Sequence, residues 1–197
     1  MTFKFDAPEV AGVSARVMTP AATNVRAHAY LRVLNRLAER YTLADVTDHS
    51  PFAPYLTFDP SRGDMGLILE DERRLPVASM WVSFITAKGF IADSVPEMVV
   101  SVEPNWRGKG IGGWLIKQAV NYGRTHGISV SVESESPARR LYARNEFVTQ
   151  SDEGVMLRTL SPLITAVAVY CGSVMGERPE FAEAAAELGE ELARRNI

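Results

Sequence analysis

The chain has 197 residues, 46% of them hydrophobic and 23% charged, which is typical of a folded globular protein and excludes a disordered chain or a small cross-linked scaffold. Its 21 basic and 24 acidic residues leave a formal charge of only -3, so no strong field favours nucleic acid or an anionic membrane as the main partner. The single cysteine, Cys171, excludes an internal disulfide and a cysteine-based zinc site, and the scattered histidines show no metal-ligand spacing. We therefore expect a protein without a bound metal.

The N-terminal segment lacks the apolar region of a signal peptide, because Asp6 and Glu9 stand where that region would be. The longest nearly uncharged apolar stretch, residues 162–175, is shorter than the roughly 20 residues needed to cross a bilayer. Together with the lone cysteine, these features predict a cytoplasmic protein that is not directed to a membrane.

The first predicted elements are a strand over residues 13–18 and a helix from residue 24 to about residue 41. In that helix the apolar residues recur at alternating spacings of three and four, which places one face against the core: Ala27, Tyr30, Leu34, Leu37 and Tyr41. Residues 47–64 are rich in Pro, Asp and Ser and are predicted to form a long loop. Such a loop is either a site of substrate selection or a plain connection.

The chain from residue 66 to residue 160 alternates between strand and helix patterns. Two apolar runs flank the charged turn DERRLP and predict a hairpin of strands over residues 66–70 and 77–85. The run at 98–102 is almost continuously apolar, as in a strand covered on both faces. The later predicted elements are a helix from residue 111 to residues 126–127, a strand over 128–132, a short helix opening at Ser136 and Pro137 and ending near Asn145, and strands over 147–149 and 155–160.

The hydrophobicity and charge pattern of the sequence changes after residue 160. The apolar segment is followed by a predicted acidic helix over residues 179–195, which has a narrow apolar stripe. We therefore expect two regions, a globular domain over 1–160 and a C-terminal extension over 161–197. A narrow stripe favours a helix that docks, so the extension is expected to make a homodimer contact or to cover the site of the main domain.

The densest chemical signal is the sequence RGKGIGG at residues 107–113, between a buried strand and an amphipathic helix. Glycines let backbone N–H groups approach a ligand closely, and the start of a helix attracts anions, so the pattern is typical of a phosphate site. The alternative is a glycine-rich turn without a ligand. A Walker A loop is excluded, because Lys109 is followed by Gly110 rather than by Ser or Thr.

The dinucleotide-binding fingerprint is a closer competitor. Gly108, Gly110 and Gly113 satisfy its glycine spacing, and Glu133 lies twenty residues further on. Five residues separate the end of the strand at Val102 from the first glycine, however, and few further strand and helix units follow. An NAD(P)-dependent oxidoreductase is therefore the weaker alternative.

The whole stretch resembles the GNAT superfamily of acetyl-CoA-dependent N-acetyltransferases, from about Val13 to Leu160. The central motif of that family, V-x-P-x-x-[QR]-x-x-G-x-[GA], stands here as VEPNWRGKGIG over residues 102–112. A second motif, L-Y-x-x-x-G-F, stands as LYARNEF over residues 141–147. The resemblance implies a mixed α/β sheet, the GNAT-like acyl-CoA N-acyltransferase fold, with a C-terminal helical extension.

Two residues depart from the family pattern. Glu146 replaces the glycine of the second motif, and because a non-glycine residue avoids positive φ, we expect the turn there to differ in conformation. Glu135 stands where many members have Asn, so one hydrogen bond to the pantetheine arm is in doubt.

The resemblance implies acetyl-CoA as co-substrate and assigns it two binding segments. Backbone N–H groups at the glycine turn would bind its pyrophosphate, and a splayed strand would pair edge-on with its pantetheine arm. The implied contacts are Val100, Ser101 and Val102 on the strand, and Arg107, Gly108, Lys109, Gly110, Ile111, Gly112 and Gly113 at the turn, together with Tyr142. Lys109 is either a point charge near the phosphates or a solvated loop lysine.

Catalytic roles are implied for a tyrosine and a carboxylate. In the family a tyrosine at the place of Tyr142 protonates the departing thiolate; the alternative is a core tyrosine. An amine acceptor must lose a proton before it attacks, so a carboxylate base is expected. Glu133 is the first candidate, followed by Glu103 and Glu97, and each is otherwise an ordinary strand-end carboxylate.

The sequence thus predicts an acyltransferase that moves the acetyl group of acetyl-CoA to a primary amine by direct attack, with the oxyanion held by backbone N–H groups. The acceptor is expected to be a small molecule or a peptide, with Trp81 and Phe84 either lining its pocket or lying in the core. The first rival is a CoA-binding sensor or assembly domain of the same fold without catalysis.

Overall fold

The computed structural model describes residues 5, 8, 10–48, 51–122, 125–150, 154–160 and 179–194. The chain divides into two compact units, Met1–Ser161 and Pro162–Ile197, and each is described here by itself. The predicted apolar segment over 162–175 lies outside the described residues. Within the described part of the chain, no helix is both long and apolar enough to cross a membrane.

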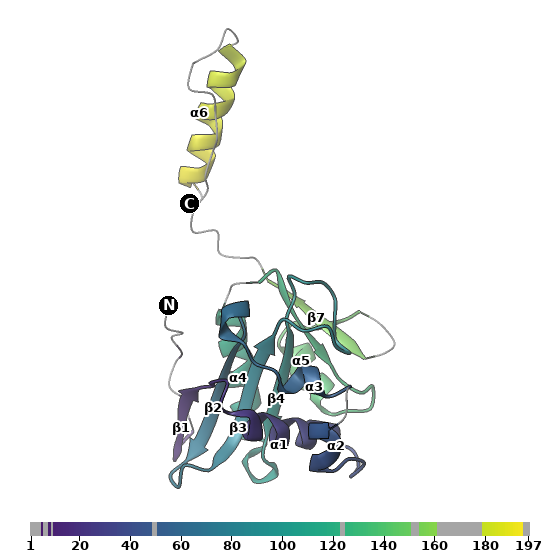
Figure 1. Ribbon diagram of the computed structural model, residues 1–197. Helices are drawn as coiled ribbons and strands as arrows, with labels where there is room; N and C mark the ends of the chain where they lie inside the picture. Colours follow the sequence, from purple (N-terminus) through teal and green to yellow (C-terminus); the bar gives the residue numbers. More distant parts are fainter. Residues whose placement is uncertain are drawn as a thin grey trace. The chain divides into compact units, whose positions relative to one another are not determined.

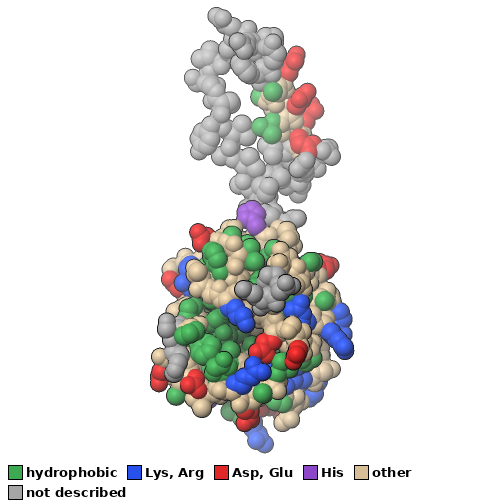
Figure 2. All heavy atoms as spheres, turned by 90° about the vertical axis from the view of Figure 1, so that its right-hand side faces the viewer, with side chains coloured by type: hydrophobic (Ala, Val, Ile, Leu, Met, Phe, Trp, Pro, Cys, Tyr) green, Lys and Arg blue, Asp and Glu red, His purple; other side chains and the backbone are tan. Residues whose placement is uncertain are grey.

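The second unit contains helix α6 (Pro179–Arg194), which confirms the predicted acidic helix. Its described side chains are mostly exposed, and Figure 2 shows acidic and hydrophobic ones along it. On the first unit the same view shows basic and acidic side chains interspersed over one face, as the small net charge leads one to expect.

The first unit is built on a mixed seven-stranded sheet with the strand order β1-β2-β3-β4-β5-β7-β6 (Figure 1). Every neighbouring pair is antiparallel except β4 and β5, which are parallel. The predicted hairpin is confirmed as β2 and β3. The strands are β1 (Val13–Val17), β2 (Met65–Asp71), β3 (Pro76–Ser83), β4 (Glu97–Val102), β5 (Gly127–Ser131), β6 (Val148–Thr149) and β7 (Val155–Thr159).

Helices cover both faces of the sheet, and the alternation of side chains along β4 separates the two cores. Met98 belongs to the cluster that contains Ile111 and Leu115 of α4, whereas Val99 belongs to the cluster of α1 to α3 on the opposite face. The helices are α1 (Thr23–Leu34), α2 (Leu43–Asp48), α3 (Ala53–Leu56), α4 (Ile111–Asn121) and α5 (Ala138–Arg144), with short 3-10 turns η1 (Pro60–Arg62) and η2 (Pro104–Trp106).

Helix α1 is shorter than the sequence predicts, because it ends at Leu34 instead of near residue 41. The side-chain oxygen of Asn35 accepts hydrogen bonds from the backbone N–H groups of Arg40 and Tyr41, both at 3.0 Å. Asparagine competes in this way with the helical backbone and favours a turn. Leu37 and Tyr41, predicted for the core face, are consequently 39% and 38% exposed.

The predicted long loop over 47–64 contains short helical turns instead, and it packs closely on α1. Tyr55 of α3 is 2% exposed and stacks on Tyr30 of α1, with ring centroids 4.3 Å apart. Arg26, also 2% exposed, donates to the carbonyls of Thr19 (3.1 Å), Pro20 (2.9 Å) and Leu56 (3.0 Å). These bonds clamp α1, the turn before it and the end of α3 into one wall.

The turn after α5 corrects the expectation about Glu146. This residue adopts φ +65°, the left-handed conformation that the glycine of the family motif would take, so the turn is retained without the glycine. The Glu146 carboxylate pairs with Arg158 Nη2 at 2.8 Å. A non-glycine residue pays a steric cost in this region, because its Cβ approaches the following carbonyl.

Candidate active site

Strands β4 and β5 separate immediately after they meet. Their only register pair is Glu97 with Ser129, and no described strand pairs with that edge of β4 beyond it. On the other edge, the N–H of Glu103 donates to the carbonyl of Val77 at 2.9 Å. Because antiparallel neighbours exchange both bonds at every second residue, the backbone groups of Met98, Val100 and Val102 point away from β3 and toward the gap.

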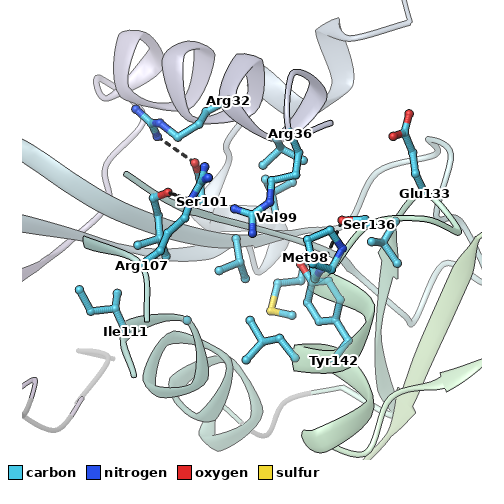
Figure 3. A pocket seen from close by; sticks show the side chains of 18 of the residues that line it. Arg32, Arg36, Met98, Val99, Ser101, Arg107, Ile111, Glu133, Ser136 and Tyr142 are labelled. Atoms are coloured by element: carbon cyan, nitrogen blue, oxygen red, sulfur yellow. Dashed lines mark hydrogen bonds between the residues drawn. The ribbon is translucent and has the colours of Figure 1, made fainter. Parts of the chain in front are cut away.

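The gap opens into a cavity of about 570 Å³, which brings together α1, α3, β4, the glycine turn and α5 (Figure 3). Most of the residues predicted to bind the cofactor line this cavity. They are Val100, Ser101, Val102, Arg107, Gly108, Gly110, Ile111, Gly112, Gly113 and Tyr142. Ser101 lines it through its side chain, since its backbone groups pair with β3.

The glycine turn is shaped for a ligand that approaches the backbone. Gly108 and Gly110 have φ +76° and +83°, and a Cβ added at either would meet no atom within 4 Å. Gly110 is the N-cap of α4 and provides no side-chain cap, so the first N–H groups of that helix are open to an anion. Gly112 has a packing role instead, because a Cβ there would lie 2.9 Å from Leu141.

The two basic residues of the turn are placed differently. Arg107 lines the cavity and donates through Nε to the carbonyl of Val102 at 3.0 Å, one of the backbone groups that face the gap. Lys109 does not line the cavity, and its Nζ lies 4.5 Å from the centroid of the ring of Trp106, a lining residue, in a cation–π contact.

Tyr142 belongs both to the core and to the cavity wall. It is 7% exposed, packs edge-on against Phe147, and its ring lies below Met98 in Figure 3. Burial raises the pKa of Tyr142 to about 12, with the positive charge of Arg36 acting in the opposite direction. The hydroxyl therefore stays protonated at neutral pH and is available as a donor.

The first two candidate bases are held by arginines. Glu133 lies between β5 and α5 at the rim of the cavity, is 44% exposed, and pairs with Arg40 Nη1 at 3.3 Å. Glu103 follows β4, does not line the main cavity, and forms a close ion pair with Arg32 Nη2.

Glu97 is in a different environment. It is 2% exposed at the point where β4 and β5 diverge, and it accepts hydrogen bonds from Ser131 Oγ (2.6 Å), the Tyr55 hydroxyl (3.1 Å to each oxygen) and the Gly89 N–H (2.9 Å). Burial raises the pKa of Glu97, although the hydrogen bonds act against this. Ser131 and Tyr55 line the cavity, so they connect the buried carboxylate to it.

The structure also places residues at the cavity that the sequence did not single out. Arg32 and Arg36 of the α1 region, one helical turn apart, point toward it from above β4 in Figure 3. Tyr30 and Tyr55 form an aromatic wall on the same side. The available signal was the Arg32 and Arg36 spacing of four, which carries little weight in a chain where arginine is the common cation. Trp81, Phe84 and Glu135, all considered earlier, do not line the cavity.

A mixed sheet with a parallel pair that splays beside an uncapped, glycine-rich helix start defines an acyl-CoA transferase architecture and not a dinucleotide-binding one, which requires a doubly wound parallel sheet. Residues 67–149 match the family model described as the acetyltransferase (GNAT) domain. The chain therefore contains a GNAT acetyltransferase domain and is an acyltransferase, as the sequence motifs predicted.

Solved structures share the fold at low sequence identity. A phosphinothricin acetyltransferase of the GNAT superfamily from Sinorhizobium meliloti, in complex with AcCoA, is 17% identical with a TM-score of 0.56, over 84% of this chain and 97% of that one. A GNAT-family acetyltransferase from Staphylococcus aureus is 12% identical with a TM-score of 0.53, over 76% and 99%. The protein yncA from Salmonella typhimurium, with its cofactor acetyl-CoA, is 19% identical with a TM-score of 0.52, over 81% and 99%. No curated protein sequence matches the chain.

Proposed function

We propose that the protein transfers the acetyl group of acetyl-CoA to a primary amine by direct attack of the amine on the thioester. The observation that carries this proposal is the continuous cavity that joins the open helix start of α4, the unpaired edge of β4, Tyr142 and the Glu97 network. Acetyl-CoA supplies the activated acetyl group, and the products are the N-acetylated amine and free CoA thiol.

The donor set of this chain fits a CoA-like molecule. The open N–H groups at Gly110 to Gly113 suit a pyrophosphate, and no side chain occupies the space above Gly108 and Gly110. The backbone groups of Val100 and Val102 face the gap and suit the amides of a pantetheine arm, which would add to β4 as a strand does. A backbone N–H on this edge would also stabilise the oxyanion.

The geometry favours Glu97, ahead of Glu133, as the group that takes the proton of the amine. An alkyl ammonium has a pKa near 10.4, so about 4 to 5 kcal/mol is needed to deprotonate it at pH 7. A hydroxyl of Ser131 or Tyr55 would accept the amine proton while passing its own to the Glu97 carboxylate. A raised pKa makes that carboxylate a stronger base than an exposed one.

Tyr142 is proposed as the acid that protonates the departing thiolate. Its hydroxyl has no hydrogen-bond partner among the described residues and it lines the cavity. Its pKa of about 12 keeps the hydroxyl protonated at neutral pH and makes it a weaker acid than a free phenol. A thiol has a pKa near 8.5, so the thiolate is a good leaving group. Protonation by the acid therefore contributes less to the rate than deprotonation of the amine by the base.

Free thiol release from acetyl-CoA, followed against a panel of primary amines, tests the proposal. Amine-dependent release with formation of the N-acetyl product is expected. If acetyl-CoA stabilises the protein against heat but no amine accelerates release, the chain is a CoA-binding sensor; if only NADH stabilises it, CoA binding itself is wrong.

For the C-terminal region we propose, as the sequence suggested, a homodimer contact or a cover over the acceptor site. Deleting Ser161–Ile197 and measuring the mass in solution and the amine-dependent rate tests both roles. A truncated protein with the same mass and the same rate would contradict them.

A further inference from the structure

We propose that the acceptor is a small amine that also carries a negatively charged oxyacid group, a carboxylate or a phosphonate, and that Arg36 binds this group with support from Arg32. The proposal rests on the proposed acetyl transfer and goes beyond it by naming the chemical class of the acceptor. Among the described lining residues, Arg32, Arg36, Lys88, Arg107 and Arg144 are basic, and Glu133 is acidic.

Too few acidic side chains are available near the centre of the cavity to neutralise its basic groups. Glu133 pairs with Arg40 on the rim, and Glu103 pairs with Arg32 from outside the main cavity. The pKa of Arg107 is lowered first by burial and then by the positive charges of Arg36 and Arg32, with Glu103 acting in the opposite direction, so both arginines lie close enough to repel Arg107. An anion bound between them would relieve that repulsion.

Arg36 is the member of this group that is free to bind. Arg32 uses Nη1 for Ser101 Oγ (2.8 Å) and Nη2 for Glu103, and Arg107 uses Nε for the Val102 carbonyl. For the Arg36 guanidinium no hydrogen bond or ion pair is found within the described part of the chain, and Figure 3 shows it pointing into the cavity beside Val99. A planar guanidinium suits the two oxygens of an oxyacid group.

The position of Arg36 assigns the anion to the acceptor and not to the cofactor. The phosphate site at the start of α4 lies on the face of the sheet to which Met98 points, whereas Arg32 and Arg36 approach from the face to which Val99 points. That second face also holds the Tyr30 and Tyr55 wall, and the Tyr55 hydroxyl leads to Glu97. An acceptor there would direct its amine to the Tyr55 and Ser131 hydroxyls and its anion to Arg36.

The same charges disfavour polyamines. A di- or tricationic acceptor would bring further positive charge beside Arg36, Arg32 and Arg107, and the Glu97 carboxylate is the only acidic group that the proposed proton path supplies to offset it. An amine acceptor with no second charged group avoids this repulsion, but it also lacks an anionic group that Arg36 could attract.

Matched pairs of acceptors test the proposal in the full chain. Each pair is an α-amino acid and its amide, for example alanine and alaninamide. The amide amine has the lower pKa, because the carboxylate no longer stabilises the ammonium, so chemistry alone favours the amide. We expect kcat/KM to be about tenfold higher for the acid, as one charge-assisted pair provides. Amides that react as well as or better than the acids would overturn the proposal.

Arg36→Met keeps most of the side-chain stem and removes the charge. We expect it to lower kcat/KM for the acid about tenfold more than for the amide and to leave the KM for acetyl-CoA unchanged, with partial recovery in Arg36→Lys. Arg73→Met, which removes the same charge from the exposed hairpin turn, is the control and should change nothing. Equal losses for acid and amide, or a raised KM for acetyl-CoA, would show that Arg36 serves another group.

A binding measurement separates this inference from the proposed catalysis. In the presence of CoA, the acid should raise the thermal stability of the protein more than the amide does, and Arg36→Met should abolish the difference. If no amine reacts but this difference is found, the transfer is wrong and the anion site stands. If amines react and no difference is found, the transfer stands and the anion site is wrong.

Discussion

The two sides of the cavity are built in opposite ways. The side proposed for the cofactor is made by one continuous segment, from β4 through the glycine turn into α4, and most of its ligand-facing groups belong to the backbone. The side proposed for the acceptor is made by side chains from separate segments: Arg36 after α1, Tyr55 in α3, Glu97 at the start of β4 and Ser131 at the end of β5.

This difference separates what every acetyltransferase of the fold needs from what is particular to one chain. Backbone groups are the same whatever side chains they carry, so a backbone site keeps its ligand while the sequence around it changes. Side chains on several segments can change one at a time, so the acceptor side is where specificity can differ without loss of the fold. Variants on the two sides should therefore affect different kinetic constants.

The largest effect is expected from Glu97→Gln on the acceptor side. The substitution keeps the size of the side chain and removes the proposed base, so kcat should fall by about 10² to 10⁴. The KM for acetyl-CoA should change little. Glu133→Gln tests the competing candidate. If kcat falls more in Glu133→Gln than in Glu97→Gln, Glu133 is the base.

The pH dependence of Glu97 provides a second readout. Because burial raises its pKa in the folded state, the unfolded chain ionises first as the pH rises. The contribution of Glu97 to stability is thus complete below the unfolded pKa and is lost as the pH rises through the folded pKa. The rate, in contrast, should rise over that range in the wild type and not in Glu97→Gln. Thermal melts and rate profiles that show the same slope in both proteins would contradict this.

On the cofactor side, Gly110→Ala should raise the KM for acetyl-CoA about tenfold. Alanine at φ +83° is strained by about 1 to 2 kcal/mol, so the turn would shift and misplace the N–H groups at the start of α4. The preference for acids over amides should remain. Gly189→Ala in α6 is the matched control, because its Cβ meets nothing and its φ is not positive. If the acceptor preference changed and the KM did not, the two sides would not be separable.

A smaller effect is expected from Tyr142→Phe, which sits where the two sides meet. Loss of the acid should lower kcat about tenfold, less than loss of the base, because a thiolate leaves without much help. The ring packing on Phe147 should keep the melting temperature close to that of the wild type. An unchanged kcat would return Tyr142 to the role of a core residue.

The smallest effect is expected from a substitution in the turn after α5, which should change only the free energy of unfolding. Glu146→Gly should stabilise the protein by about 1 kcal/mol, because glycine adopts φ +65° without the Cβ clash and the exposed ion pair with Arg158 is worth little. Urea unfolding measures the change. Destabilisation would mean that the ion pair outweighs the backbone strain.

The sequence predicted the strands that form β2 to β5 and the glycine turn, because each depends on residues that are close in the chain, and the family resemblance implied the GNAT architecture. It predicted α1 too long, because hydrophobic spacing does not report that the Asn35 side chain bonds to the backbone beyond the helix. It also assumed that Glu146 would avoid positive φ, whereas the tertiary structure imposes it. Arg36 and Tyr55 could not be predicted as site residues, because only the folded chain brings them to the gap.

The buried Arg26 guanidinium bonds to carbonyls before α1 and at the end of α3, and so joins segments thirty residues apart. Local opening of α3 would remove the Leu56 carbonyl from the buried Arg26 guanidinium, and a buried charge without its hydrogen-bond partner is costly, so α1 and α3 should open together. Their slowest amide protons would then exchange with solvent at one common rate. The acceptor wall would fold and unfold as a unit, and an acceptor that bound it would slow exchange in both helices at once.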